Sequence, residues 1–131
     1  MLAVTLPTFE QADIGIALDH LSASELDEIG FGVIGFDAAT NVCEYNAFES
    51  QAAGLRAESV LARPLFKVVA PCMNNFMVAQ RFDDAAATGI DLDATIDYVL
   101  TLRMRPVKVR LRLIAAKGLL LRYVLVERSA R

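Results

Sequence analysis

The alternation of apolar and polar side chains divides the chain into an N-terminal helical part and a longer part that mixes strands and helices. Between residues 9 and 26, apolar residues recur at helical spacing with acidic and polar residues between them, which is typical of short surface helices. Ser22 followed by Glu25 fits a capping box, because the hydroxyl can accept from a helical amide while the carboxylate reaches back to the cap amide. Residues 1–28 are therefore expected to form a helical cap that precedes the sheet.

Five apolar runs have the length and the flanking turns of β-strands. FGVIGF and VCEY stand on either side of DAATN, a turn-forming sequence, and together they predict a hairpin. Residues 92–103, 107–116 and 119–127 predict three further strands in the C-terminal third of the chain.

Helices are expected between the hairpin and these three strands. Residues 46–69 hold short apolar clusters interrupted by glycine and proline, which predicts several single-turn helices instead of one long helix. Asn74 or Asn75 is expected to cap a longer helix that passes through Phe76. Gly89 is well placed to end it in the left-handed conformation.

The strand at 107–116 has one basic and one apolar side. Lys108, Arg110 and Arg112 share one side, which is expected to be solvated because alternating charges on an outer sheet face usually are. The chain is thus expected to form one α+β domain with a five-stranded antiparallel sheet. Helices cover one side of this sheet, and the cap, residues 1–28, covers part of the other side of a core formed by residues 29–131.

Composition and charge narrow the classes of protein that fit. A chain of 131 residues, 55% hydrophobic and 22% charged, can bury a core without disulfides or metals. Its net charge of −3 opposes a general affinity for nucleic acid. No apolar run reaches the roughly 18 residues of a membrane-spanning helix, and the N-terminus lacks the pattern of a signal peptide. A cytoplasmic protein that contacts neither nucleic acid nor membrane is expected.

Few side chains offer conventional catalytic chemistry. The only histidine, His20, lies in the expected cap, and no phosphate-binding loop or zinc-binding helix motif is present. Cys43 and Cys72 have no metal-ligand spacing, and Cys43 is expected to be a small apolar filler inside a strand. Cys72 precedes the expected helix cap, where amides stabilise a thiolate, although a buried structural cysteine is the commoner role.

Tyr45 and Glu49 form a second candidate group. Their spacing at a strand end and a helix start allows both side chains to enter one cavity. From the spacing alone, a half-buried tyrosine and a solvated glutamate are the more ordinary interpretation.

The residues around these positions form several recognisable segments, of which the most specific are YNAFE and, at a characteristic distance after it, VAPC. The full set is SASELDEIGFGVIGFD, NVCEYNAFE, FKVVAPC, ATG and RMRPVKVRL, which together span most of the chain. These segments resemble the photoactive yellow protein family, blue-light receptors with a PAS fold that carry p-coumaric acid as a thioester on a cysteine.

The resemblance implies a role for each candidate residue. Cys72 is the expected attachment site, and Tyr45 and Glu49 are the expected hydrogen-bond donors to the chromophore's phenolate oxygen. Glu49 would have to be protonated in the dark and would transfer its proton after light isomerises the chromophore, and the unpaired carboxylate would then loosen the N-terminal cap.

Several pocket positions differ from the family pattern. Ala53 stands where a threonine usually supports the tyrosine, and Leu55, followed by Arg56, stands where an arginine usually covers the ring. Leu102 replaces an aromatic residue, whereas Met104 keeps a methionine that contacts the chromophore. Leu55, Arg56 and Met104 are counted among the expected chromophore contacts, in a drier pocket than usual.

Two other interpretations remain open. In the first, the chain is a PAS-like interaction module that binds another small molecule or binds nothing. In the second, it is an enzyme with Cys72 as nucleophile, although this cysteine lacks a nearby proton acceptor. A sensor of this kind signals to a downstream partner that the sequence does not identify, as a monomer or a weak homodimer.

Overall fold

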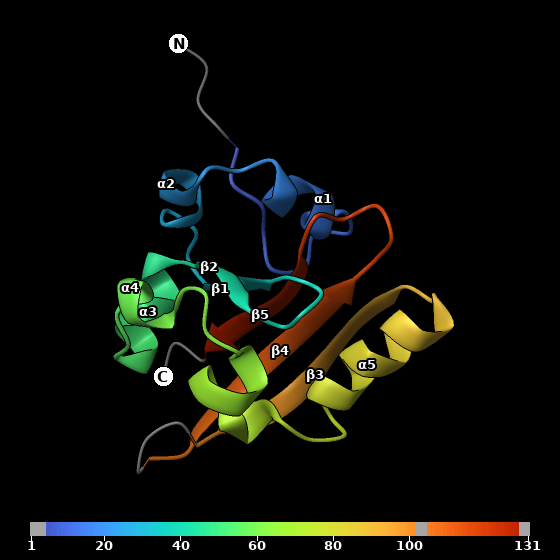
Figure 1. Cartoon of the computed structure of the whole chain (residues 1–131). Coiled ribbons are helices and arrows are strands. Elements are labelled where there is room, and N and C mark those ends of the chain that lie inside the picture. Colours follow the sequence, from blue (N-terminus) through green and yellow to red (C-terminus); the bar gives the residue numbers. More distant parts are fainter. Residues whose placement is uncertain (1–4, 102–104, 129–131) are drawn as a thin grey trace.

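A computed structural model describes residues 5–101 and 105–128 and contains the expected five-stranded antiparallel sheet. The strand order is β2-β1-β5-β4-β3, so that the N-terminal hairpin joins the three C-terminal strands through β5 at the centre (Figure 1). The strand bounds are β1 (Gly32–Phe36), β2 (Val42–Tyr45), β3 (Leu92–Leu100), β4 (Val107–Ala115) and β5 (Arg122–Arg128).

The N-terminal segment covers one face of the sheet, called here the outer face. It contains α1 (Ile14–Asp19) and α2 (Ala23–Leu26), and the predicted capping box is present, with Ser22 N donating to Glu25 at 2.8 Å and Glu25 N donating to Ser22 at 3.2 Å. The segment seals a small apolar core against side chains of β1, β4 and β5. Its buried members are Phe9, Ile14, Leu18, Leu26, Ile29, Phe31, Val33, Ile114, Tyr123 and Leu125.

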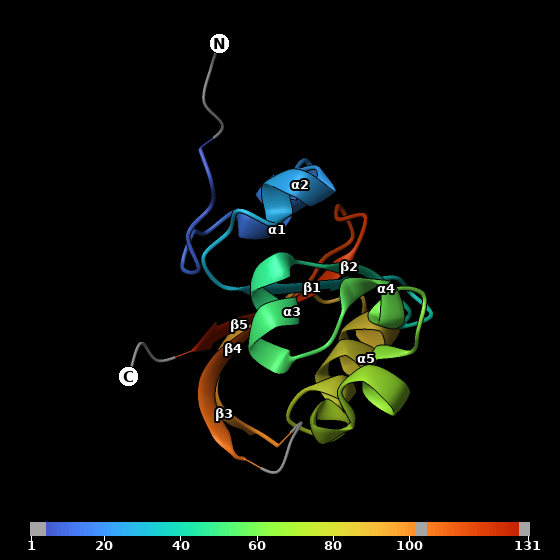
Figure 2. The same ribbon diagram turned by 90° about the vertical axis from the view of Figure 1, so that its left-hand side faces the viewer.

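The remaining helices cover the opposite, inner face (Figure 2). They are α3 (Ala47–Ala53), α4 (Ala57–Val60), a π-helical turn η1 (Leu65–Val69), a 3-10 turn η2 (Pro71–Met73) and α5 (Ala79–Thr88). Between them and the sheet lies the larger apolar core, which includes Phe36, Phe66 and Phe82 in edge-on and tilted ring contacts. The prediction of several short helices between residues 46 and 69 is thus confirmed, although α3, with seven residues, has about two turns and not one.

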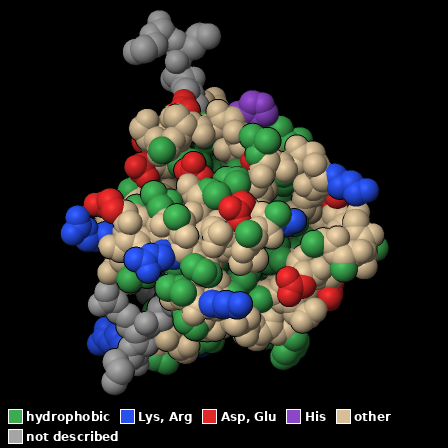
Figure 3. Space-filling model, in the orientation of Figure 1, with side chains coloured by type: hydrophobic (Ala, Val, Ile, Leu, Met, Phe, Trp, Pro, Cys, Tyr) green, Lys and Arg blue, Asp and Glu red, His purple; other side chains and the backbone are tan. Residues whose placement is uncertain are grey.

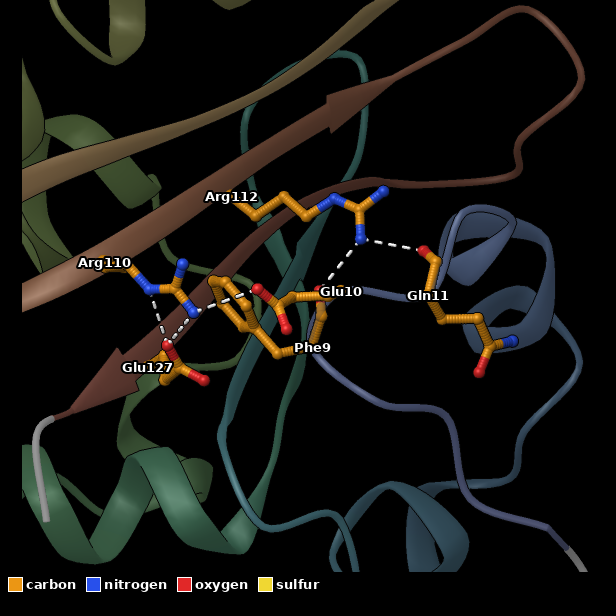
Figure 4. Close-up of polar contacts among 6 residues, drawn as sticks. All are labelled: Phe9, Glu10, Gln11, Arg110, Arg112 and Glu127. Carbon is orange, nitrogen blue, oxygen red and sulfur yellow. Dashed lines mark hydrogen bonds and ion pairs between the residues drawn. The ribbon is translucent and has the colours of Figure 1, made fainter.

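The basic side of β4 is not uniformly solvated, so that prediction was wrong for Arg112. Its side chain is only 7% exposed, since it makes a two-pronged ion pair with Asp93 of β3, both bonds being 2.8 Å. Its remaining terminal nitrogen donates to the carbonyls of Phe9 and Gln11 at 2.9 and 2.8 Å (Figure 4). The strand pattern placed Arg112 on the outer face correctly, but it does not reveal that the N-terminal segment covers it.

Arg110 also contacts the N-terminal segment. Its guanidinium carbon lies 5.2 Å from the centre of the Phe9 ring, and Nε donates to Glu127 of β5 at 2.7 Å (Figure 4). A longer contact of 3.5 Å joins it to Glu10. Arg110, which is half-exposed, and Arg112, which is buried, therefore both hold the N-terminal segment on the sheet.

Helix α5 begins later than the sequence predicts. Asn75 caps a turn instead, because its Oδ1 accepts from the amides of Met77 and Val78 at 2.9 and 3.2 Å. Val78 has a non-helical backbone, and the helix starts at Ala79, which leaves Phe76 outside it and 79% exposed. The end is as predicted, with Gly89 in the left-handed conformation at φ 72°.

The surface mixes charged and apolar side chains. Acidic and basic groups are interspersed with apolar ones over the face drawn in Figure 3. Phe76 and Leu120 are large apolar residues left mostly exposed, at 79% and 82%. No helix within the described residues is both long and apolar enough to cross a membrane.

Candidate functional site

The turn from β2 into α3 positions the first two candidate residues. Asn46, which is 1% exposed, caps α3 by accepting from the amide of Glu49 at 3.1 Å. The same oxygen accepts from Val33 at 2.9 Å, and Nδ2 donates to the carbonyls of Leu26 and Phe31, both at 3.0 Å. Every polar atom of this buried amide is therefore used, and α3 is fixed to β1 and to the N-terminal segment. This role was not predicted from the sequence, although an asparagine before a short helix is a recognisable capping signal.

Tyr45 and Glu49 are both buried, which contradicts the interpretation of Glu49 as a solvated helix residue. Tyr45 is 6% exposed and packs in the inner core, and Glu49 is 1% exposed. The Glu49 carboxyl group lies directly over Gly32 of β1, where a Cβ atom would be 2.0 Å from Oε1. Only a glycine at this position lets the carboxyl group approach the strand so closely.

Arg128, the last residue of β5, binds the Glu49 carboxyl group. Its two terminal nitrogens donate to the two oxygens of Glu49 at 2.7 and 3.0 Å. The Arg128 side chain is 15% exposed, so the pair is largely withdrawn from water. Arg128 was not predicted from the sequence, because nothing in the local pattern connects residues so far apart in the chain.

Burial dominates the electrostatics of this group. It raises the pKa of Glu49, because an apolar environment disfavours the carboxylate, while the hydrogen bonds and charge of Arg128 act in the opposite direction. The pKa of Tyr45 is also raised, first by burial and then by the negative charge of Glu49, with Arg128 again opposing. The three side chains thus influence one another electrostatically from β2, α3 and β5.

Cys72 borders a cavity on the same side of the sheet. It lies in η2 after the apolar run of η1, half-buried, beside a space of about 620 Å³. Leu55 lines this space, as does Ala53, which lies one helical turn beyond Glu49 in α3. The other lining residues are Ser59, Val60, Val68, Val69, Pro71 and Thr101.

Tyr45 and Glu49 are not among the residues that line this cavity. Tyr45 belongs to the same packed apolar cluster as the lining residues Val60 and Val69, and Cys72 packs against that cluster. Tyr45, which is buried, and Cys72, which is half-buried beside the cavity, thus contact the same apolar cluster. Glu49 is linked to this group through its electrostatic effect on Tyr45.

A hydrogen-bonded clamp holds the backbone of Cys72. The Tyr98 hydroxyl, from the inner side of β3, donates to the Cys72 carbonyl at 2.5 Å. Asn75 donates to the same carbonyl at 3.2 Å and to the Tyr98 oxygen at 2.6 Å. Neither contact was predicted, although the alternation of β3 points Tyr98 inward and the signal was available in principle.

The other expected residues have different positions. Arg56 is 80% exposed in its side chain and pairs with Glu58 at 3.0 Å, so it points to solvent and not into the cavity. Met104 and Leu102 lie outside the described residues.

Cys43 is exposed on the edge strand β2, so the prediction of a small apolar filler was wrong. Partial burial and the negative charges of Asp37 and Glu44 raise the pKa of its thiol, which reduces the thiolate fraction.

Comparisons with known proteins connect this arrangement to a family. No protein-family model matches the chain. The photoactive yellow proteins of Rhodothalassium salexigens and Halochromatium salexigens are 32% and 33% identical to it over 105 residues, which make up 80% of this chain and 83% of each relative. The chain belongs to the photoactive yellow protein family.

Solved structures agree with this assignment. The photoactive yellow protein domain of the sensor histidine kinase Ppr from Rhodospirillum centenum superimposes with a TM-score of 0.79 at 32% identity, covering 87% of this chain and 99% of that domain. The PAS domain of the RpfR receptor from Cronobacter turicensis, at 13% identity and a TM-score of 0.59, shares the fold alone and covers 78% of this chain. The protein is thus a PAS-fold member of a family of sensory photoreceptors.

Proposed function

We propose that this chain is a blue-light receptor that carries p-coumaric acid as a thioester on Cys72. The observation that carries the proposal is the buried Glu49 carboxyl group, held beside Tyr45 on the side of the sheet where Cys72 borders a cavity. A core that only needed to be filled gains little from a carboxyl group at this position, since the loss of water around a buried ion pair often outweighs the attraction between its charges, here those of Glu49 and Arg128.

The residues present fit a p-coumaroyl group. The cavity of about 620 Å³ lies within the usual range for small-molecule sites and is walled mainly by apolar side chains, which suits a planar aromatic acid. The walls are drier than in the family pattern, because Ala53 and Leu55 replace polar residues.

Each side chain has a distinct task in this proposal. Cys72 contributes its thiolate to the thioester, and the Tyr98 clamp on its carbonyl fixes the orientation of the attachment turn. Tyr45 donates its hydroxyl to the phenolate oxygen, and Glu49 in its neutral form donates a second hydrogen bond. The bound group would supply absorption of blue light and isomerisation about its double bond, after which Glu49 gives up its proton.

A nucleophilic enzyme is a weaker candidate. His20 is at the end of α1 on the outer face, and its ring nitrogen Nδ1 forms a hydrogen bond of 2.8 Å with the carbonyl oxygen of Ile16. Cys72 lies among the elements that cover the inner face. We therefore assign His20 no role in activating Cys72.

Reconstitution tests the proposed function. Purified protein treated with an activated p-coumaric acid should become yellow, and mass spectrometry should place the added mass on a Cys72 peptide. Cys72→Ser should abolish the colour, whereas Cys43→Ser, which removes the exposed thiol, should not. A wild-type sample that stays colourless would favour a PAS-like module with another ligand or none.

A further inference from the structure

Arg128 approaches Glu49 from the inner face of the sheet. Along β5, Val124 and Val126 face the inner core, so Arg128 extends the same row beyond the end of the apolar cluster. It binds both oxygens of Glu49 with both terminal nitrogens, and this two-pronged geometry fixes orientation as well as charge.

The surroundings of Glu49 contain few other charges. From β2 the neighbour is Tyr45, from β1 it is Gly32, and within α3 Asn46 and Ala53 are uncharged. Asp27 accepts from the amide of Ala47 at the start of α3, at 2.7 Å. Among the described residues, Arg128 is the only cation that contacts the Glu49 carboxyl group.

The proposed function requires this site to hold one negative charge in either of two places. With a protonated Glu49, the charge is on the phenolate oxygen. After the Glu49 O–H bond breaks and its proton bonds to that oxygen, the charge is on the Glu49 carboxylate. The number of protons and the total charge are the same on both sides of the step, and without a chromophore the charge again belongs to Glu49.

We propose that Arg128 is a positioning residue that neutralises whichever of these two anions the site holds. This inference rests on the proposed function for the phenolate and on the observed ion pair for the carboxylate. Proton transfer from Glu49 then leaves a carboxylate paired with Arg128, and not the unpaired carboxylate that the family resemblance implies, because Arg128 already lies within hydrogen-bond distance of both oxygens. Light changes the anion with which Arg128 pairs.

The chromophore-free protein supplies the first test. With ¹³C-labelled glutamate, and with Glu49→Gln to assign its signal, NMR follows the ionisation of Glu49 as a function of pH. Arg128→Met should raise the midpoint by about one pH unit or more, since one unit corresponds to a tenfold change in equilibrium. Arg122→Met, on the same strand and the same side but at its other end, should leave the midpoint unchanged.

The outcome is decisive in either direction. A Glu49 carboxyl group that is already protonated at neutral pH in the wild type, or a midpoint equal in the wild type and Arg128→Met, would overturn the inference. If Arg128→Met does not fold, Arg128→Gln removes the charge while keeping a donor, and the same midpoint shift is required of it.

The reconstituted protein supplies the second test. The pH at which the bound phenol ionises, read from its absorption band, should also rise in Arg128→Met relative to the wild type and Arg122→Met. A wild type that takes up no chromophore contradicts the proposed function, while the NMR result still decides the pairing of Arg128 with Glu49. If the wild type becomes yellow but Arg128→Met leaves the ionisation midpoint of the phenol unchanged, the proposed function stands and the role of Arg128 is contradicted.

Discussion

Burial raises the pKa of the Glu49 carboxyl group, an effect that its position in the sequence alone does not predict. A glutamate in the first turn of a helix is ordinarily solvated and ionised, and it stabilises the helix dipole. Here Glu49 is only 1% exposed, and its carboxyl group fits against strand β1 because the residue beneath it, Gly32, has no side chain. Its ionisation is therefore set by neighbours from other elements, and substitutions among them should be visible in the chromophore's absorption.

Glu49→Gln should keep the colour and move the absorption band to longer wavelength. An amide donates a weaker hydrogen bond to a buried anion than a carboxylic acid does, so the phenolate's charge is less localised on its oxygen. Absorption spectra of the reconstituted variant measure the shift, with Glu58→Gln, at an exposed ion pair, as the control. Difference infrared spectra should lose a protonated carboxyl band on illumination in the wild type only. An unchanged band in the wild type, with an unaltered photocycle in the variant, would remove Glu49 from the mechanism.

Gly32→Ala should destabilise the protein and disturb the Glu49–Arg128 pair. The added Cβ would lie 2.0 Å from Oε1 of Glu49 and 3.1 Å from Val126, so the carboxyl group must move. Overpacking of this kind costs about 1–3 kcal/mol of unfolding free energy, measurable by urea denaturation. Gly30→Ala is the matched control, because no atom lies within 4 Å of its Cβ position. Equal effects of the two substitutions would show that the close approach has no energetic importance.

The sequence predicted part of the candidate site and not the rest, for a physical reason. Tyr45, Glu49 and Cys72 were predicted because they lie in the motifs YNAFE and VAPC, which resemble the family, and their roles stay predictions. Arg128 and Tyr98 were missed because their contacts depend on which strands become neighbours in the sheet. Only the register of β5 beside β1, with Gly32 opposite Val126, places Arg128 next to Glu49.

At the scale of elements, periodicity predicted the strands better than their partners. The alternation along β4 correctly assigned Arg112 to the outer face, but the prediction that this face is wet failed because α1, α2 and the chain before them cover it. The prediction of where α5 starts was wrong for a similar reason, since Asn75 binds Tyr98 and Cys72 in addition to capping a turn. Both errors arise from tertiary contacts that a local pattern does not contain.

Arg112→Met should weaken the attachment of the N-terminal segment without unfolding the sheet. The carbonyls of Phe9 and Gln11 lose their charged donor, and buried groups left unsatisfied cost about 1–3 kcal/mol. Hydrogen exchange should therefore show faster exchange of amides in residues 9–26. Lys108→Met, on the same side of β4 but exposed, is the control, and a similar acceleration in both variants would argue against the role of Arg112.

At the scale of the whole molecule, we expect the N-terminal segment to be the part that moves on illumination. It packs on the outer face through a core separate from the inner one, and it can detach while the central strands remain paired. We expect illumination of the reconstituted protein to lower hydrogen-exchange protection in residues 9–28, with β4 (Val107–Ala115) as the internal reference. If residues 9–28 stay as protected in the light as in the dark while other segments open, this segment is not the output.

The end of β5 gives such a movement a short route through the sheet. Glu127 and Arg128 are consecutive, so their side chains leave the strand on opposite faces. Arg128 holds Glu49 on one face, and Glu127 holds Arg110, which lies over the Phe9 ring, on the other. A rotation of this two-residue segment that lets Arg128 follow a new anion must also turn Glu127. We expect such a rotation to carry the state of the buried site to the opposite surface of the protein across a single peptide bond.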